Sequence, residues 1–201
     1  MDSYKTPSKK QRFELEIKRS RFITTVEKVS EKQHALRFIT EQQKEMPDAN
    51  HHCWAMIAGQ PDDIYQHDQS DDGEPKGTAG KPMLNVLSHS GFGNIVVVVT
   101  RYFGGIKLGT GGLVRAYTQS TTEALKKLVT ETTYIRTEIT IELPYNVLDT
   151  FVHWMKDTNI VVADKQFQQS IIVKVHSPES EIDTLQQTVV KLGGSIVSNL
   201  R

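Results

Sequence analysis

Apolar and polar residues follow one another along the first part of the chain with the periods of strands and helices. The stretch RFELEIKRSRFITTVEKV alternates, which predicts two short strands around a turn near Arg19 and Ser20. The stretch SEKQHALRFITEQQKEMP has its apolar residues at helical spacing. We expect a helix that begins with a capping box of Ser30 and Gln33 and ends at Pro47.

The middle of the chain contains its most apolar segments. HHCWAMIAG predicts a buried strand, and the four consecutive valines of NIVVVVTRYF predict a strand covered on both faces. Between them lie a long polar segment, residues 60–81, and a short helix in PMLNVLSHS with Pro82 at its first position. A longer helix follows in LVRAYTQSTTEALKKLV, with one stripe of core positions from Leu113 to Leu128.

The last third of the chain changes character. Its patterns follow the order strand, helix, strand, strand, helix, strand, and Pro144 and Pro178 lie at the two helix starts. This βαββαβ order is typical of a ferredoxin-like fold. We therefore expect an α+β chain of two domains, residues 1–133 and 134–201, with the boundary near Glu131.

Charge and composition narrow the classes of function. Lys plus Arg equals Asp plus Glu at 24 each, and the first domain carries 18 basic and 16 acidic side chains. This balance argues against wholesale electrostatic binding of nucleic acid but leaves room for a local basic patch. The single cysteine, Cys53, excludes an internal disulfide and fits a reducing compartment. With no signal-peptide pattern and no apolar run near the ~20 residues that cross a bilayer, we expect a cytoplasmic protein without membrane contact.

The first candidate site is a glycine-rich junction between a strand and a helix, RYFGGIKLGTGGLVRAY. Glycines let the backbone approach a ligand, and a helix start offers unpaired N–H groups and a positive dipole end. We expect Thr110 to be the N-cap. The alternative is an ordinary tight connection, because neither a P-loop nor a dinucleotide fingerprint is present. The candidate anion- or nucleic-acid-binding residues are Lys76, Lys81, Arg101, Tyr102, Phe103, Gly104, Gly105, Lys107, Gly109, Thr110, Gly111, Gly112 and Arg115.

The second candidate is the loop SDDGEPKGTAGKP, residues 70–82. Carboxylates alternating with glycine suit Mg²⁺ or Ca²⁺, which makes Asp71, Asp72 and Glu74 candidate metal ligands, although the EF-hand spacing is absent. The alternative is a solvated acidic loop whose glycines allow unusual turns. The residues of this motif are Asp71, Asp72, Gly73, Glu74, Pro75, Gly77, Thr78, Ala79 and Gly80.

The third candidate is HHCW. In a strand, His51 and Cys53 face one way and His52 and Trp54 the other. His51 and Cys53 with His67 or Asp68 could form a zinc site, although paired ligand spacing is absent. Cys53 with a nearby histidine could instead act as a thiol nucleophile. The alternative is a small buried cysteine with histidines at a strand edge.

Four of these stretches, HHCWA, SDDGEPKGTAGKPML, NIVVVVTRYFGGIKLGTGGLVRAY and EAL, together resemble the IMPACT family in its two-domain, bacterial YigZ-like form. The resemblance implies a first domain with the fold shared by a small-subunit ribosomal protein and domain four of elongation factor G. It implies a second domain similar to the ferredoxin-like domain five of that factor. It also implies a role in translational control or in association with nucleic acid or the ribosome.

These observations favour a non-enzymatic, translation-related regulator that binds RNA, the ribosome or a translation factor through the glycine-rich basic surface. We expect a monomer that needs no cofactor. Two alternatives stay open. One is a metal-assisted hydrolase that uses the acidic loop with His51 or His52 as the base. The other is a pure protein–protein adaptor.

Overall fold

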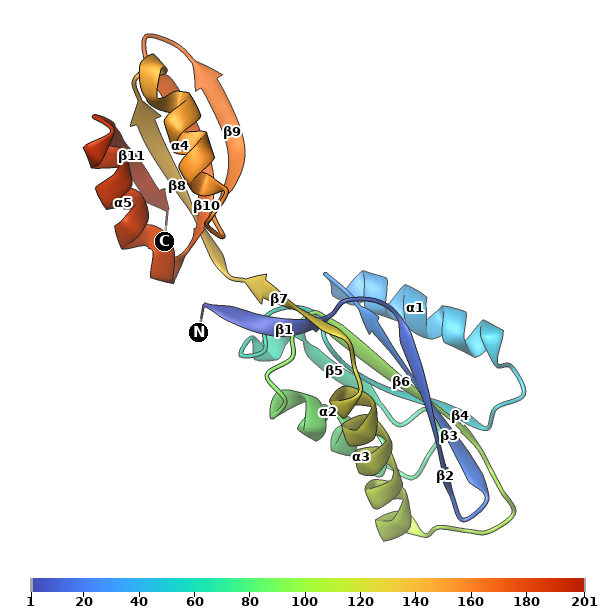
Figure 1. Ribbon diagram of the computed structural model, residues 1–201. Helices are drawn as coiled ribbons and strands as arrows, with labels where there is room; N and C mark the ends of the chain where they lie inside the picture. The colour runs from blue at the N-terminus through green and yellow to red at the C-terminus, as the bar shows by residue number, and fades with distance from the viewer. Residues whose placement is uncertain (1, 201) are drawn as a thin grey trace. The chain divides into compact units, whose positions relative to one another are not determined.

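The computed structural model describes residues 2–200, which form two compact units (Figure 1). The first unit comprises Tyr4–Thr132, and the second takes in the described residues before Tyr4 and after Thr132. Both units mix helices with strands, which confirms the α+β class. The elements up to and across the boundary are β1 (Ser3–Pro7), β2 (Gln11–Ile17), β3 (Ser20–Lys28), α1 (Lys32–Glu45), β4 (His51–Ile57), η1 (Ile64–Gln66), β5 (His67–Ser70), α2 (Gly80–Ser88), β6 (Ile95–Tyr102), α3 (Thr110–Lys126) and β7 (Thr130–Tyr134).

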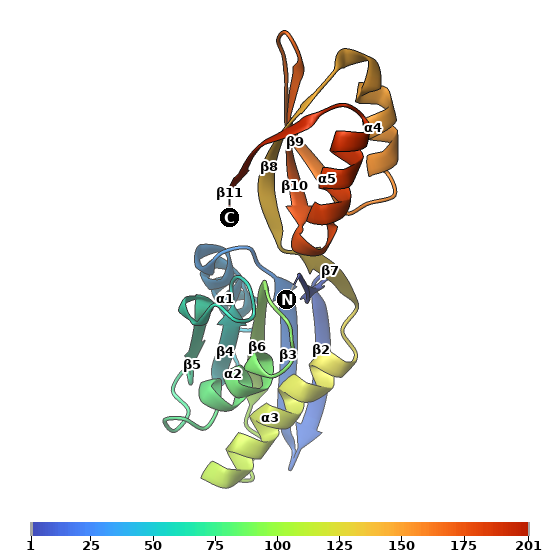
Figure 2. The same ribbon diagram turned by 90° about the vertical axis from the view of Figure 1, so that its left-hand side faces the viewer.

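Five strands of the first unit form one antiparallel sheet in the order β2-β3-β6-β4-β5. The valine-rich strand β6 lies at its centre. Val97 and Val99 pack in one core with residues of α2 and α3, and Val96 and Val98 pack with α1 on the opposite face. Figure 2 shows α2 and α3 in front of this sheet. The prediction of a strand covered on both faces is confirmed.

The hairpin of β2 and β3 turns at Lys18 and Arg19, one residue earlier than expected. Both residues have positive φ angles, 47° and 65°. Two left-handed residues in succession are the signature of a tight turn whose twist matches that of the two strands it joins. The tip of the hairpin therefore presents two consecutive basic side chains, both exposed.

Two helix starts and one strand differ from the prediction. The N-cap of α1 is Glu31, and no side chain caps the helix, so the Ser30–Gln33 capping box is wrong. Helix α2 begins at Gly80, which places Pro82 within the first turn, where its missing N–H needs no acceptor. The polar segment 60–81 contains β5, which among the strands of residues 2–200 pairs with β4 alone. Its sequence HDQS does not alternate between apolar and polar residues. An edge strand has only one neighbouring strand and can form without burying apolar side chains.

The second unit is a four-stranded antiparallel sheet in the order β11-β8-β10-β9. Phe151 of α4 and Leu185 of α5 pack in one core with Ile141 and Val173 of the sheet. The chain order confirms the predicted βαββαβ pattern. Its elements are β8 (Arg136–Leu143), η2 (Tyr145–Val147), α4 (Leu148–Met155), β9 (Val161–Phe167), β10 (Ile171–Pro178), η3 (Glu179–Glu181), α5 (Ile182–Lys191) and β11 (Ser195–Leu200).

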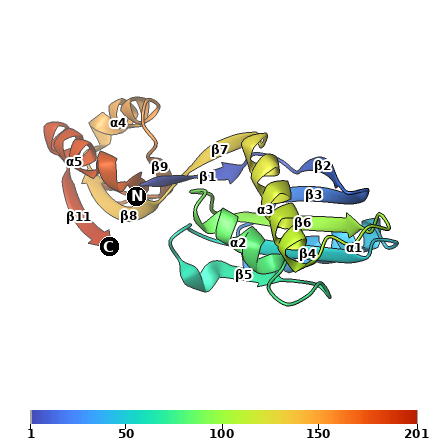
Figure 3. The ribbon, with the colours of Figure 1, turned by 90° about the horizontal axis from the view of Figure 1, so that it is seen from below.

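Strands β1 and β7 pair separately as a two-stranded sheet, and they lie side by side in Figure 3. None of the helices between residues 2 and 200 is both long and apolar enough to span a membrane.

Candidate functional site

One carboxylate, that of Asp71, shapes the acidic loop. Its Oδ2 accepts a hydrogen bond from the Gly77 amide at 2.7 Å, and its Oδ1 accepts from the amides of Ala79 and Gly80 at 2.9 Å each. Thr78, Ala79 and Gly80 are buried. Residues 70–82 are therefore an ordered, internally bonded loop that leads into α2.

The same hydrogen bonds change the acidity of Asp71. Burial opposes its ionisation, but the three amide hydrogen bonds outweigh burial, and the pKa of Asp71 is lowered. Its ionised form therefore stabilises the fold above the ordinary aspartate pKa of ~4, and this contribution is lost as pH falls through the lowered folded-state pKa.

We expect Asp71→Asn to reduce stability at neutral pH, with a difference from wild type that narrows as the pH is lowered toward about 2. Urea unfolding at a series of pH values measures this difference. The exposed Asp68→Asn serves as the control for loss of one negative charge. Parallel pH profiles for wild type and Asp71→Asn would contradict the role given to the ionised carboxylate.

A buried ion pair lies behind the loop. Arg101 Nη1 donates to Glu74 Oε1 at 2.5 Å, and the two side chains are only 7% and 3% exposed. The Tyr117 hydroxyl donates to the same oxygen at 2.8 Å. Arg101 was expected to be a free cation for anion binding. The structure instead buries it and neutralises its charge with Glu74.

Cys53 lies next to this network. Its Sγ is 2.9 Å from the Asp71 carbonyl oxygen and 3.3 Å from the Tyr117 hydroxyl oxygen. Burial is the main cause that raises the pKa of the Cys53 thiol and of the Tyr117 hydroxyl. A buried thiol that stays protonated is a poor nucleophile and a poor metal ligand. The structure therefore favours the interpretation of Cys53 as a small buried core residue.

The two histidines connect β4 to the acidic loop through Asp72. The His52 amide donates to Asp72 Oδ2 at 2.5 Å, and His51 Nδ1 lies 2.8 Å from the Asp72 carbonyl oxygen. The three acids of the loop thus have three different sets of partners. The described chain contains no group of three or more His, Cys, Asp or Glu side chains that could hold a metal ion. The candidate site of Asp71, Asp72 and Glu74 is not assembled here.

The glycine junction ends at the start of α3. The N-cap is Gly109, with φ of 72°, and Thr110 is the first helical residue, so the prediction that Thr110 caps the helix is wrong. The Leu113 amide donates to the Gly109 carbonyl at 2.9 Å. Within residues 2–200, the amides of positions 110–112 have no acceptor. They remain available to solvent or to a ligand, as expected of a helix start.

The acidic loop and the glycine junction meet at one pocket of about 390 Å³. The loop contributes Glu74 and Pro75, and the junction contributes Phe103 and the segment 107–110. His51 of β4 lines the pocket as well. Phe103 is 46% exposed, whereas Tyr102 is half-buried with the Arg21 guanidinium 5.5 Å from its ring centroid.

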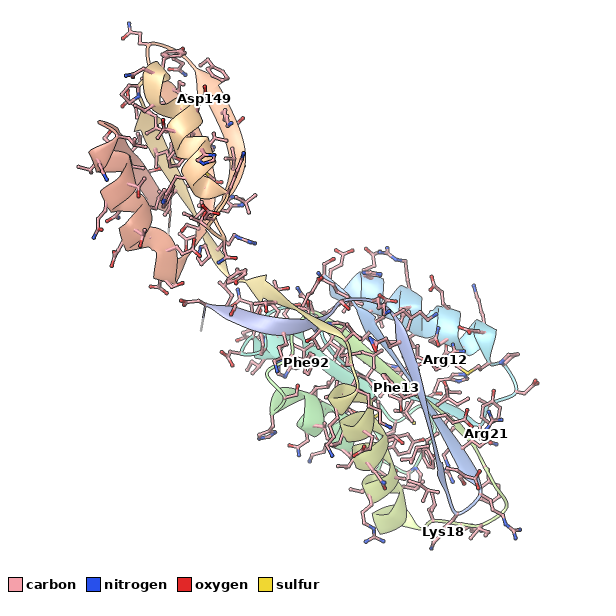
Figure 4. The ribbon with its side chains drawn as sticks, viewed as in Figure 1. Arg12, Phe13, Lys18, Arg21, Phe92 and Asp149 are labelled. Carbon is pink, nitrogen blue, oxygen red and sulfur yellow. The ribbon has the colours of Figure 1, made fainter. Side chains whose placement is uncertain are left out.

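Six exposed basic side chains lie on the segments that form or adjoin this pocket, namely the hairpin tip, the acidic loop with the first turn of α2, and the junction with the first turns of α3. We call them the basic rim, and Lys107 lines the pocket itself. They include two that the sequence prediction missed, Lys18 and Arg19. An added Cβ on Gly104 would lie 2.0 Å from the Arg19 carbonyl carbon, so the hairpin turn and the junction are in contact. Figure 4 shows Lys18 at the hairpin tip. The basic rim consists of Lys18, Arg19, Lys76, Lys81, Lys107 and Arg115.

None of the six rim side chains forms an ion pair with another described residue, in contrast to Arg21, which is paired with Glu14. The sequence could not reveal the contribution of Lys18 and Arg19, because the hairpin precedes the junction by more than eighty residues. The only local signal was a pair of basic residues at a predicted turn.

Comparison with known proteins extends over both units. The sequence model of the Impact N-terminal domain matches residues 18–125. The chain is 40% identical over 201 residues to an "IMPACT family member" of Haemophilus influenzae, covering 100% of this chain and 98% of the relative. It is 41% identical over 182 residues to "IMPACT family member YigZ" of Escherichia coli, covering 90% and 89%. A solved structure titled "Crystal structure of an hypothetical protein" matches with a TM-score of 0.72 and 37% identity over 98% of each chain. The chain belongs to the IMPACT family.

Proposed function

We propose that this protein is a non-enzymatic, translation-related regulator that binds single-stranded RNA through the basic rim and the pocket it surrounds. The observation that carries the proposal is the basic rim itself. Six exposed cations have no ion-pair partner among the described residues, and they lie on the hairpin tip, the acidic loop, the junction and the first turns of α2 and α3. The start of α3 adds amides without acceptors among the described residues. Protein cations and helix N-termini are the groups that contact nucleic-acid phosphates.

The exposed Phe103 adds a stacking surface beside these cations. Proteins that bind single strands combine a positively charged path for the backbone with aromatic faces for the bases. A local patch of this kind is compatible with a chain whose formal net charge is zero, because phosphates respond mainly to charges within a Debye length, about 8–10 Å at physiological salt.

The test is a triple substitution of Lys76, Lys107 and Arg115 by Ala. We expect the affinity for a fluorescent single-stranded RNA to fall at least about tenfold at low salt. The slope of log affinity against log salt should become shallower by about 2, since each phosphate contact on a single strand contributes about 0.7. Fluorescence anisotropy over a salt series measures both quantities.

The matched control replaces Lys156, Lys165 and Lys191 of the second unit by Ala, which removes the same three charges elsewhere. It should bind RNA as wild type does. Equal affinity and equal salt slope for wild type and the rim variant would reject the basic rim as the RNA-binding surface. Cosedimentation with partners from lysate that survives both the rim substitutions and ribonuclease treatment would favour a protein–protein adaptor instead.

A further inference from the structure

Two hydrogen-bond acceptors face each other across a short gap at the wall of the pocket. His51 Nδ1 lies 2.8 Å from the Asp72 carbonyl oxygen, which can only accept, so whenever the ring is neutral its proton is on Nδ1. His51 Nε2 is then an acceptor. It lies 3.9 Å from Glu74 Oε2, too far for a direct hydrogen bond.

Glu74 uses its two oxygens unequally. Oε1 accepts from both Arg101 and Tyr117, whereas Oε2 accepts no hydrogen bond from any described residue. The Glu74 side chain is 3% exposed. Oε2 is not one of the fully buried side-chain atoms that lack a partner among the described residues, so it is open to the pocket that Glu74 lines and a donor entering the pocket can reach it. A group with two N–H bonds, placed between Oε2 and His51 Nε2, would satisfy both acceptors at once.

The other residues that line the pocket indicate what kind of molecule carries this N–H donor group. Phe103 and Leu108 supply apolar surface, and Pro75 adds to it from the acidic loop. Lys107 and Thr110, the first residue of α3, also line the pocket, and a lysine with a helix start suits an anionic phosphate. A volume of about 390 Å³ falls at the small end of ligand pockets, which suits a single nucleotide.

We infer that the pocket receives the base of one unstacked nucleotide of the bound RNA and selects a base with an exocyclic amino group, such as adenine. The amino group donates to Glu74 Oε2 and His51 Nε2, the ring stacks on Phe103, and the adjoining phosphate contacts Lys107 and the α3 amides. This inference rests on the proposed RNA binding and adds to it a site for one particular base. Uracil and unsubstituted purine lack the amino donor that the two acceptors require.

The test uses single-stranded RNA probes of about ten nucleotides, a length within the site sizes of single-strand-binding folds. The probes carry adenine, unsubstituted purine or an abasic sugar at one central position of a uridine background. Wild-type protein should bind the adenine probe about tenfold more tightly than the purine probe, because a good pair of base contacts discriminates by at least that factor. Both should bind more tightly than the abasic probe.

Two variants test the separate parts of the pocket. His51→Phe should remove the preference for adenine over purine. Phe103→Ala should lower the affinity for the adenine and purine probes by the same factor and leave the affinity for the abasic probe unchanged. A variant that had merely unfolded would lose affinity for all three probes. Equal wild-type affinity for adenine and purine probes would overturn the base site while leaving RNA binding intact. No binding of any probe would overturn both the base site and the proposed function.

Discussion

Replacing Glu74 with glutamine is expected to lower the free energy of unfolding of the first unit by about 3 kcal/mol or more. The substitution keeps the shape of the side chain but leaves the buried Arg101 guanidinium without a compensating charge. Breaking a buried ion pair from one side costs about 3–5 kcal/mol, because the remaining charge stays desolvated and unpaired. The double variant Glu74→Gln/Arg101→Met should recover a large part of the loss, since no buried charge then remains.

The chain offers a direct readout for this measurement. Its two tryptophans lie one in each unit, Trp54 in β4 and Trp154 in α4. In a Trp154→Phe background, urea unfolding followed by fluorescence reports the first unit alone. The control is Glu14→Gln, which breaks the exposed pair with Arg21 and should cost at most about 1 kcal/mol. A Glu74→Gln variant no less stable than this control would contradict the role of the buried pair.

Replacing Gly104 with alanine is expected to destabilise the first unit by about 2 kcal/mol, within the range seen for overpacking. The added Cβ would lie 2.0 Å from both the carbonyl carbon and the carbonyl oxygen of Arg19. These are backbone atoms of a tight hairpin turn, and they cannot shift to relieve the clash as the end of a flexible side chain can. The junction must therefore move away from the hairpin. Because Phe103 and Lys107 lie on this junction, we also expect weaker RNA binding under conditions where the variant is folded.

Gly111→Ala is the matched control for this substitution. A Cβ at Gly111 meets no atom within 4 Å, and the residue lies in the first turn of α3. Alanine favours a helix over glycine by up to about 1 kcal/mol, so we expect unchanged or slightly higher stability. The same fluorescence measurement compares the two variants. Equal stabilities for Gly104→Ala and Gly111→Ala would contradict this expectation, because they would show that the hairpin and the junction can move apart at no cost in stability.

Much of the fold follows from local pattern. Four consecutive valines predict a central strand, and the alternation of residues 12–29 predicts a hairpin, because burial imposes a period on each element separately. The helix starts were predicted less well. Ser30 and Thr110 both have the chemistry of an N-cap, but neither is the capping residue. A cap depends on the direction from which the chain enters the helix, and that direction is set by packing.

The candidate site, too, was predictable from the sequence only in part. The sequence by itself marked the acidic loop and the glycine junction as unusual, because their glycines, prolines and charges cannot build a core. It could not decide what each charge does. The tertiary structure brought Glu74 against Arg101, which buried a cation that the sequence had offered as a ligand, and brought Lys18 and Arg19 to the junction. The sequence specifies which residues carry a charge. Whether a charged side chain is buried, paired or free depends on which distant segments of the chain pack against it.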